Sequence, residues 1–406
     1  MTKKYKTKDV LIVTESNFRT MLSVIRNIKR NEKDVEIIAI AKEDYGGTKS
    51  RYISNKITSK KDYLEIIRKV ALENEGAFIF PHLEETYLYL YKEGINNIIA
   101  PSKILANKIT NKIEVISGVY KNIPYIVPET VFISEDSVSK KIDVIKEFIK
   151  EHKKVILKAT TEIGKIYGPY NRYVVIDKKN ITNILNSDDF IFFLKNNLSL
   201  ILQRYIDGFG IGIGGFWYKG KHVAIGGHRR ILQSHGNEGI SLIAESYVNE
   251  KARKEAVKIM ELFDYTGIGL VEFRLDYNGN VWFMEINPRV WGTLPLYIEA
   301  GLDIPYIAYI SFKYGENKNI FYNNFIEGKK MLFLKDYVIH TYNENKSSLF
   351  RLAKELIKIP YLLMKYKEGT FDLRDPLPFI YDNFLFLSKG LIRRFFIGVK
   401  SESDCL

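Results

Sequence analysis

An Asn-Gly dipeptide, Asn278-Gly279, lies between two apolar, β-prone runs in the stretch 270–292, which reads LVEFRLDYNGNVWFMEINPRVWG. This combination is the strongest short-range signal for a β-hairpin, and it predicts a type I′ turn with a two-residue loop. Counting outward from that loop along antiparallel strands places Glu272 directly opposite Glu285. The hairpin therefore constrains both the local fold and the position of two carboxylates.

Two opposed carboxylates repel each other across a strand pair, which favours a site where a cation lies between them. Because side chains alternate between the faces of a strand, Asn287 joins Glu285 on one face. Two carboxylates and an amide oxygen are hard ligands that suit Mg²⁺. Arg289, just beyond the strand, is placed to bind an anion bidentately. A surface hairpin with solvated glutamates is the alternative for the glutamate pair taken alone.

The first hundred residues alternate between runs of strand length and runs with helical spacing. Such alternation predicts a parallel sheet covered by helices. The turn after the first strand, 14–18 (TESNF), lacks the glycines of a dinucleotide fingerprint, so this Rossmann-like layer is not expected to hold NAD. The expected strands are 9–15, 35–42, 77–81 and 97–101, and the expected helices are 18–29 and 62–72.

The pattern changes in the second quarter of the chain. A helix is expected from Ser102, as its N-cap, to about Tyr120. From 154 to about 287 the strands have hairpin signals and internal helices, which is typical of an antiparallel sheet in a second domain. Beyond residue 315 the chain is expected to form amphipathic helices.

Composition limits the class of protein. With 406 residues, 46% of them hydrophobic, the chain is globular and long enough for two or three domains. The one cysteine, Cys405, permits no internal disulfide and the lysine-rich N-terminus lacks a signal-peptide core, so a cytoplasmic protein is expected. The net charge of +13 comes from scattered lysines without a nucleic-acid-binding signature, so no nucleic-acid partner is expected.

The carboxylate hairpin also carries a family resemblance. Glu272 within VEF and the run EINPR at 285–289 resemble the metal-binding signature of the ATP-grasp superfamily, which includes biotin carboxylase and many carboxylate–amine ligases. The resemblance implies that Glu272, Glu285 and Asn287 hold two Mg²⁺ ions, or Mn²⁺ in their place, on the phosphates of ATP. It also implies that Arg289 stabilises the transferring phosphoryl group or the acyl phosphate.

The same resemblance implies further nucleotide contacts. Lys158, inside the apolar run VILKA, is similar to the nucleotide lysine of the family, and Lys108 matches an earlier family lysine by its position. A snorkelling strand lysine and a solvated helix lysine are the respective alternatives. One segment resembles the hinge whose backbone reads adenine, with a buried strand as its alternative; it comprises Gln203, Arg204, Tyr205 and Ile206.

Two loops complete the expected site. The strand 227–231 (GHRRI) resembles a His-Arg-Arg strand of the family that feeds a mobile loop, here 234–241. Neighbouring strand residues face opposite ways, so one arginine reaches the site, and Arg230 is favoured over Arg229. Between 160 and 172 the family carries a glycine-rich lid over the phosphates. This chain keeps few glycines there, so a plain connecting hairpin is equally consistent.

The implied architecture is α/β and α+β. It has a Rossmann-like pre-ATP-grasp domain at 1–103, a two-lobed ATP-grasp domain at 104–315 with a hinge near 203–208, and a mainly helical C-terminal extension at 316–406. The implied reaction activates a carboxylate as an acyl phosphate and couples it to an amine, giving an amide, ADP and phosphate. Small-molecule carboxylates and amines are therefore the expected partners, and a homodimer is the assembly common among similar enzymes.

Other interpretations stay open. The same fold can serve a small-molecule kinase or a carboxyphosphate-forming enzyme. A non-catalytic, membrane-peripheral nucleotide-binding protein is a further alternative. From about residue 345 the chain interleaves large apolar residues with Lys and Arg, as in 349–367 and 384–400. Such basic amphipathic helices are expected to cap the catalytic body, and association with an anionic membrane surface is the alternative.

Overall fold

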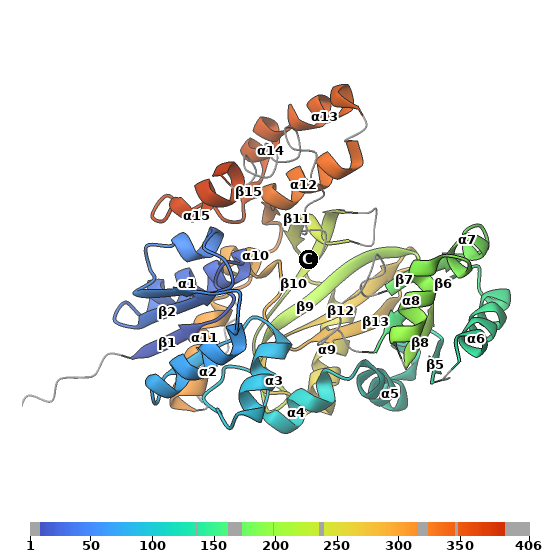
Figure 1. Cartoon of the computed structure of the whole chain (residues 1–406), viewed down its shortest axis with the longest axis horizontal. Helices are drawn as coiled ribbons and strands as arrows, with labels where there is room; N and C mark the ends of the chain where they lie inside the picture. Colours follow the sequence, from blue (N-terminus) through green and yellow to red (C-terminus); the bar gives the residue numbers. More distant parts are fainter. Residues whose placement is uncertain are drawn as a thin grey trace, which may run out of the picture.

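The computed structural model describes residues 9–134, 137–160, 173–197, 199–234, 239–315, 324–345 and 348–385. Figure 1 shows an N-terminal α/β layer at one side, a small lobe at the other and a large twisted sheet between them. The C-terminal helices lie along one edge of this assembly (Figure 1). Both the α/β and the α+β parts expected from the sequence are thus confirmed.

The N-terminal layer is a four-stranded parallel sheet in the order β3-β2-β1-β4. Helix α1 packs against one face of this sheet, and α2 and α3 cover the other face. This is the Rossmann-like layer that the alternating pattern predicted. The elements are β1 (Val10–Val13), α1 (Arg19–Asn31), β2 (Glu36–Ala41), the 3₁₀ turn η1 (Gly46–Lys49), β3 (Asn55–Thr58), α2 (Tyr63–Glu73), β4 (Phe78–Phe80) and α3 (Glu84–Lys92).

Three local expectations were wrong. Strand β3 was missed because its sequence, NKIT, is mostly exposed at the sheet edge and carries one apolar residue. The segment 97–101 makes only an isolated bridge, between Ile98 and Ile79. The expected helix from Ser102 divides into α4 (Lys103–Ile109) and α5 (Lys112–Asn122), because Asn111 caps the second helix by accepting the amide of Ile113 at 3.1 Å.

The small lobe is an antiparallel sheet in the order β5-β8-β6-β7. Its helices α6 and α8 share with the strands a hydrophobic core of its own, separate from the other cores. The lobe follows the 3₁₀ turn η2 (Pro124–Ile126) and comprises β5 (Thr130–Ile133), α6 (Val138–Glu151), β6 (Lys154–Ala159), β7 (Tyr173–Asp177), α7 (Ile181–Leu185), α8 (Asp188–Asn196) and β8 (Leu200–Arg204).

The large sheet has the order β13-β12-β9-β10-β11-β14-β15. One face packs on α5 and α9, and the other packs on α10, α11 and the N-terminal layer. Its elements up to residue 314 are β9 (Gly208–Tyr218), β10 (Lys221–Gln233), β11 (Ser241–Ser246), α9 (Glu250–Leu262), β12 (Gly267–Asp276), β13 (Val281–Asn287), α10 (Leu294–Glu299) and α11 (Ile304–Tyr314).

The C-terminal segment is mainly helical, yet it also completes the large sheet. Strand β14 pairs antiparallel with β11, and β15 pairs parallel with β14. Within the described residues, no helix combines the length and apolar character needed to cross a bilayer. The remaining elements are β14 (Lys330–Leu332), α12 (Leu334–Asn345), α13 (Leu349–Leu356), α14 (Ile359–Lys365), β15 (Lys367–Glu368), α15 (Leu377–Ile380) and the π-helical turn η3 (Tyr381–Leu385).

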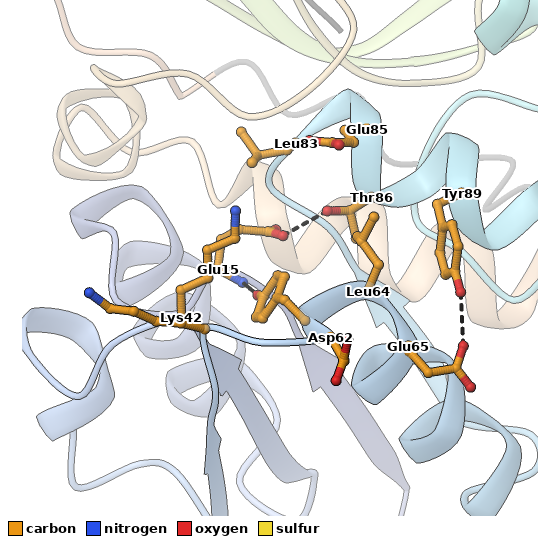
Figure 2. Close-up of a pocket in the computed structure, with 11 residues that line it drawn as sticks. Glu15, Lys42, Asp62, Leu64, Glu65, Leu83, Glu85, Thr86 and Tyr89 are labelled. Atoms are coloured by element: carbon orange, nitrogen blue, oxygen red, sulfur yellow. Dashed lines mark hydrogen bonds between the residues drawn. The ribbon is translucent and has the colours of Figure 1, made fainter. Parts of the chain in front are cut away.

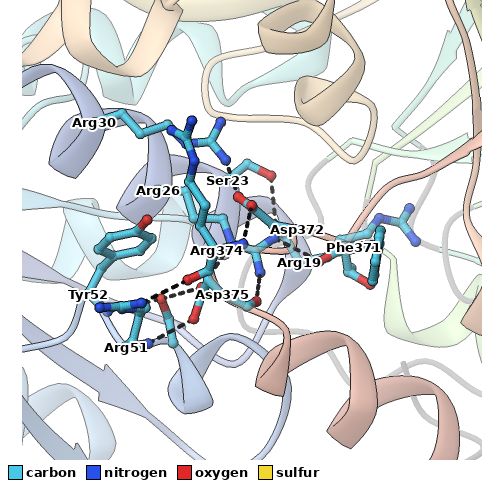
Figure 3. A network of polar contacts seen from close by, with 12 residues as sticks. Arg19, Ser23, Arg26, Arg30, Arg51, Tyr52, Phe371, Asp372, Arg374 and Asp375 are labelled. Atoms are coloured by element: carbon cyan, nitrogen blue, oxygen red, sulfur yellow. Dashed lines mark hydrogen bonds and ion pairs between the residues drawn. The ribbon is translucent and has the colours of Figure 1, made fainter.

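A buried polar network joins this segment to the N-terminal layer (Figure 3). Arg26 of α1 lies 2.9 Å from the carboxylate of Asp375, and their side chains are only 8% and 1% exposed. Arg26 also donates to the carbonyl of Thr370 at 2.7 Å. The Asp375 carboxylate accepts from Ser50 and from the amide of Arg51 at 2.7 and 2.9 Å. The segment 367–375 is therefore held to the first domain by fully satisfied charges.

Candidate active site

The two glutamates of the hairpin lie face to face, as the sequence predicted. Glu272 of β12 is the direct cross-strand partner of Glu285 of β13. The side-chain amide of Asn287 donates to one oxygen of each carboxylate at 3.3 Å. All three side chains therefore point into the same space on the face opposite the α5–α9 core.

The turn that produces this pairing differs from the expected one. The loop has three residues, 277–279, because Asp276 pairs with Asn280 and Gly279 alone adopts a left-handed φ of 80°. The Asp276 carboxylate organises the loop by accepting the amides of Asn278 and Asn280 at 2.9 and 2.8 Å. A β-bulge at Met284 then adds one residue to β13, so the glutamates end up opposed after all.

Three cationic side chains surround the carboxylates. A terminal nitrogen of Arg230 lies 2.7 Å from Glu272, and the ammonium of Lys112 lies 3.1 Å from Glu285. Lys158 projects from β6 of the small lobe, is 8% exposed and donates to the side-chain oxygen of Gln203 at 3.0 Å. The large sheet, α5 and the small lobe each contribute to this cluster.

The charges perturb one another because they are partly shielded from solvent, with Lys158 buried and the side chains of Lys112, Glu272 and Glu285 20–30% exposed. Burial lowers the pKa of Lys158 to about 8, an effect that the attraction of Glu285 and Glu272 partly offsets. Burial also raises the pKa of Glu272, and Glu285 raises it further, against the opposing effect of Arg230. Clusters of perturbed groups of this kind are typical of functional sites.

Arg289 connects the carboxylates to the N-terminal layer. Its guanidinium donates to the oxygen of Asn287 at 3.3 Å and to Glu84, the first residue of α3, at 3.1 Å. Nearby, burial and the charge of Arg289 lower the pKa of His82 to about 3, so this imidazole is neutral. Because His82 carries no charge, an anion bound there would be attracted by Arg289 and not by the imidazole.

The hinge segment lies where β8 leaves the small lobe. Gln203 joins two strands, since its amide donates to Thr130 of β5 at 2.9 Å while its oxygen accepts from Lys158. The ring of Tyr205 is contacted by two cations, Lys154 at 3.7 Å and Arg274 at 5.2 Å from the ring centre. Arg204 stacks over Trp282 at 4.9 Å, and Ile206 is buried. Adenine recognition by this segment stays a prediction.

The two arginines of the HRR strand take opposite directions, as expected. Arg230 reaches Glu272 across β9, where Gly210 leaves room for its side chain. Arg229 instead pairs with Glu245 of the neighbouring strand, at 2.5 Å. His228 is buried and bonded to the hydroxyl of Tyr297 at 2.9 Å, which fits a structural role. The part 235–238 of the expected mobile loop, like the expected phosphate lid at 161–172, lies outside the described residues.

The structure does not bring Lys108 to the site. Lys108 is exposed on α4 with its ammonium 5.4 Å from the ring centre of Phe263, whereas Lys112 at the start of α5 contacts Glu285. The division of the expected helix at Asn111 explains the error, because it turns the second lysine toward the carboxylates. An Asn-Lys pair occurs at both positions, and the N-cap signal of Asn111 could have separated them.

A cavity of about 360 Å³ opens at the carboxyl ends of all four parallel strands of the N-terminal layer. Figure 2 shows Glu15, which follows β1, bonded to Thr86 of α3; Glu15 is 2% exposed with a strained φ of 47°. Sequence reasoning missed this pocket, although ligands commonly bind at such strand ends. Its charged lining comprises the acidic Glu15, Asp62, Glu65 and Glu85 and the basic Lys42 and Lys60.

The residues present fit a divalent cation bound to phosphate. Two carboxylates project into one space, and a half-turn of the Asn287 amide, which would break its hydrogen bond from Arg289, would direct its oxygen there as well. Lys158, Lys112, Arg230 and Arg289 supply positive charge around them for anionic oxygens. The arrangement can therefore bind a metal–polyphosphate complex and stabilise charge on a transferring phosphoryl group.

Comparison with protein families supports the same interpretation. Residues 198–325, which include the hinge, the HRR strand and the carboxylate hairpin, match the family described as "ATP-grasp in the biosynthetic pathway with Ter operon". A biotin carboxylase from Nostoc is 42% identical over 53 residues. That match spans 13% of this chain and 12% of the relative.

Solved structures share the fold over most of the chain. The biotin carboxylase domain dimer of a 2-oxoglutarate carboxylase from Hydrogenobacter thermophilus, in complex with MgADP and bicarbonate, aligns with a TM-score of 0.60 and 19% identity over 80% of this chain and 74% of its own. N5-carboxyaminoimidazole synthetase from Staphylococcus aureus gives 0.61 and 14% over 84% and 87%. L-amino acid ligase from Bacillus licheniformis gives 0.54 and 14% over 75% and 74%.

Proposed function

We propose that this chain is a member of the ATP-grasp superfamily and works as an ATP-dependent ligase that activates a carboxylate as an acyl phosphate and couples it to an amine. The observation that carries the proposal is the opposition of Glu272 and Glu285 amid Lys112, Lys158 and Arg230. The side chains of these opposed carboxylates are 22% and 30% exposed and have cations beside them, and a metal–phosphate complex bound between them would account for this arrangement.

Glu272, Glu285 and Asn287 are the proposed ligands of two Mg²⁺ ions, with Mn²⁺ as an alternative ion. When bound, these ions neutralise the phosphates of ATP and hold them in line for transfer. The observed donor set of two carboxylates and an amide leaves coordination positions for phosphate oxygens, which suits Mg²⁺. The MgADP complex of the Hydrogenobacter domain supports this assignment.

The other side chains divide the remaining work. Lys158 and Lys112, whose ammonium groups lie by the carboxylates, bind phosphate oxygens. The segment 203–206 holds adenine through its backbone. Arg289 and Arg230 stabilise negative charge on the transferring phosphoryl group and on the acyl phosphate. These groups position and neutralise charge, and phosphoryl transfer requires little more from a protein.

The proposed reaction has two steps. A carboxylate oxygen of the substrate attacks the γ-phosphorus, and ADP leaves with the electrons of the broken P–O bond. The amine nitrogen then attacks the acyl carbon, phosphate leaves and the nitrogen releases a proton. The products are an amide, ADP and inorganic phosphate, so one phosphate is released for each amide formed.

The cavity at the strand ends is the proposed substrate pocket. Glu85 and Thr86 line it, and the preceding residue, Glu84, pairs with Arg289 of the carboxylate cluster. A substrate in this cavity would therefore lie next to the arginine that receives the acyl phosphate. The presence of both lysines and carboxylates in the lining favours polar substrates that carry a carboxylate or an amino group.

We further propose that the enzyme works in the cytoplasm, where ATP is available, and that it forms a homodimer. The dimer named for the Hydrogenobacter domain supports the second point. Size-exclusion chromatography with light scattering measures the mass directly.

The test is a screen for ADP release with pairs of small carboxylates and amines, followed by mass detection of the products. We expect ADP and phosphate to appear in equal amounts with an amide. Glu285→Gln is expected to lower turnover at least about a thousandfold while the protein stays folded, because a neutral amide is a weak metal ligand. Glu250→Gln, which changes a 64%-exposed glutamate, is the matched control.

Three results would reject the proposal. Full turnover by Glu285→Gln would remove the metal assignment. A stable phosphorylated product without free phosphate would identify a kinase instead. Metal-dependent ATP binding without ADP release across a broad panel would identify a non-catalytic protein.

A further inference from the structure

The outer face of α13 and α14 is unusual for a helix on a protein surface. Four large apolar side chains are exposed there: Phe350 by 80%, Ile357 by 78%, Tyr361 by 56% and Met364 by 81%. Surface helices normally direct polar residues outward. Nine of the 22 most exposed large apolar residues in the described part of the chain fall within 350–380, so the exposure is concentrated.

These four residues form one continuous stripe, which we call the α13–α14 stripe. They recur at helical spacing, and the backbone of Ile357 and Lys358 stays right-handed between the two helices. The amide of Ile357 also continues the helical bonding to Ala353 at 3.0 Å. Figure 1 shows α13 and α14 on the outer edge of the molecule, at the top of the view.

The opposite side of α14 is already used for packing. Ile359, Leu362 and Tyr366 pack on the cluster that contains Leu332 and Tyr337. The helix is therefore anchored to the body by one apolar side and presents a second apolar side outward. Among the described residues this second apolar side stays exposed, and an exposed apolar patch of this kind is typical of an interaction site.

The charged residues beside the stripe indicate which kind of partner would bind there. Arg351, Lys354 and Lys365 are exposed within the two helices, and Lys358 is 48% exposed. Glu355, the acidic residue of these helices, is 33% exposed and is paired with Lys358 at 2.7 Å. The surface is thus an apolar stripe flanked by cations, which complements an anionic bilayer surface. The sequence that follows, 386–400, continues the composition with four cations and no acidic residue.

We propose that the α13–α14 stripe docks the protein onto an anionic lipid surface. The helices lie parallel to the bilayer, with Phe350, Ile357, Tyr361 and Met364 among the acyl chains and the lysines at the phosphate groups. The proposal is independent of the reaction in the active site. It gives the basic C-terminal segment two functions, because one side closes the large sheet and the other side binds lipid.

The test is flotation of the full chain with vesicles of phosphatidylcholine alone and with vesicles that contain equal parts of phosphatidylglycerol. We expect binding to the anionic vesicles only, weakened at high salt because surface charges are screened. Ile357→Ser/Met364→Ser is expected to lower the partition coefficient at least about a hundredfold, since each buried side chain contributes about tenfold or more. Lys354→Glu/Lys365→Glu is expected to abolish the preference for anionic lipid.

The matched control is Leu72→Ser/Ile104→Ser, which removes two apolar side chains that are 59% and 85% exposed elsewhere. It is expected to bind vesicles like the unmodified chain, and all variants are expected to keep the same melting temperature. Failure of the unmodified chain to float with anionic vesicles would overturn the proposal. Equal binding by the Ile357→Ser/Met364→Ser variant would overturn it too, as would a dimer in solution that this variant dissociates.

Discussion

Lys158 shows how a single residue is tuned by its surroundings. Its ammonium is buried and donates to the side-chain oxygen of Gln203, and two carboxylates lie near enough to affect its charge. Burial dominates, so its pKa falls to about 8 from 10.5. A lysine in this state is a strong phosphate ligand only while it keeps its proton.

Nucleotide binding should therefore weaken as the pH rises above about 8. Deprotonation of Lys158 removes one positive charge from the phosphate site, which costs at most about tenfold in affinity per pH unit. Titration of a nucleotide analogue at a series of pH values measures this slope. Lys158→Arg should flatten it, because a guanidinium stays protonated. An unchanged slope in that variant would show that another group titrates.

The same shift has a defined effect on stability. Because the folded pKa is depressed, the unfolded chain binds more protons than the folded chain between pH of about 8 and 10.5. The contribution of Lys158 to the free energy of unfolding therefore increases with pH across that window.

Lys112 and Lys108 offer a direct comparison of two similar lysines. Lys112→Met should lower nucleotide affinity by about ten- to a hundredfold, since it removes a charge-assisted contact near Glu285. Lys108→Met should leave the affinity unchanged, because that lysine is exposed on α4 beside Phe263. Isothermal titration of a nucleotide into both variants measures the two affinities. A loss of affinity in Lys108→Met but not in Lys112→Met would support Lys108 as the nucleotide lysine after all.

At the scale of elements, the C-terminal segment depends on a buried ion pair. Asp375 accepts hydrogen bonds from Arg26, Ser50 and the amide of Arg51, and its side chain is only 1% exposed. Asp375→Ala should therefore lower the free energy of unfolding by about 3–5 kcal/mol, because Arg26 is left as an uncompensated buried charge.

The control for this prediction lies one turn away on the same helix. Arg30 pairs with Asp372, but its side chain is 41% exposed. Arg30→Ala should cost less than about 1 kcal/mol, because water screens the pair. Urea unfolding monitored by tryptophan fluorescence compares the two, and equal losses would contradict the role given to Asp375.

The sequence predicted elements best where a short-range rule acts alone. The alternating pattern predicted the parallel layer, and the Asn278-Gly279 dipeptide predicted the hairpin. Strand β3 was missed because edge strands need little apolar patterning. Strands β14 and β15 were missed because two or three residues carry no periodicity. Strand β14 pairs with β11, more than eighty residues earlier in the chain, and no local pattern predicts such a long-range pairing.

The candidate site likewise contains residues that the sequence predicted and residues that it did not. Counting residues from the turn predicted that Glu272, Glu285 and Asn287 lie together, since one hairpin contains all three. The contact of Lys112 with Glu285 was not predicted, because it depends on a break between two helices. The strand-end cavity was not predicted either, because four separate strands meet there. Contacts between distant segments are a property of the tertiary fold rather than of any one motif.

At the scale of the whole molecule, three structural units meet at the carboxylates. The small lobe provides Lys158, the large sheet provides the glutamates, and the N-terminal layer reaches Arg289 through Glu84. A ligand bound at this junction makes contacts that exist only in the folded chain, so it should stabilise the entire protein.

A non-hydrolysable ATP analogue with Mg²⁺ should therefore raise the melting temperature. At about a hundred times its Kd, such a ligand adds about 2.7 kcal/mol to the free energy of unfolding. A chelator should remove the metal-dependent part of the gain, and Glu285→Gln should lack that part from the start. Differential scanning fluorimetry measures both, and an equal gain with and without Mg²⁺ would contradict the metal ligands assigned here.

The bulge at Met284 has a consequence for how such sites are recognised in other genomes. A two-residue turn without a bulge would oppose the same two glutamates that the observed three-residue turn and bulge bring together. Loss of Met284 would leave Glu285 opposite Glu272 in a regular ladder. The number of residues between the two glutamates is therefore not constant. Sequence patterns used to find this hairpin should allow that spacing to differ by one residue.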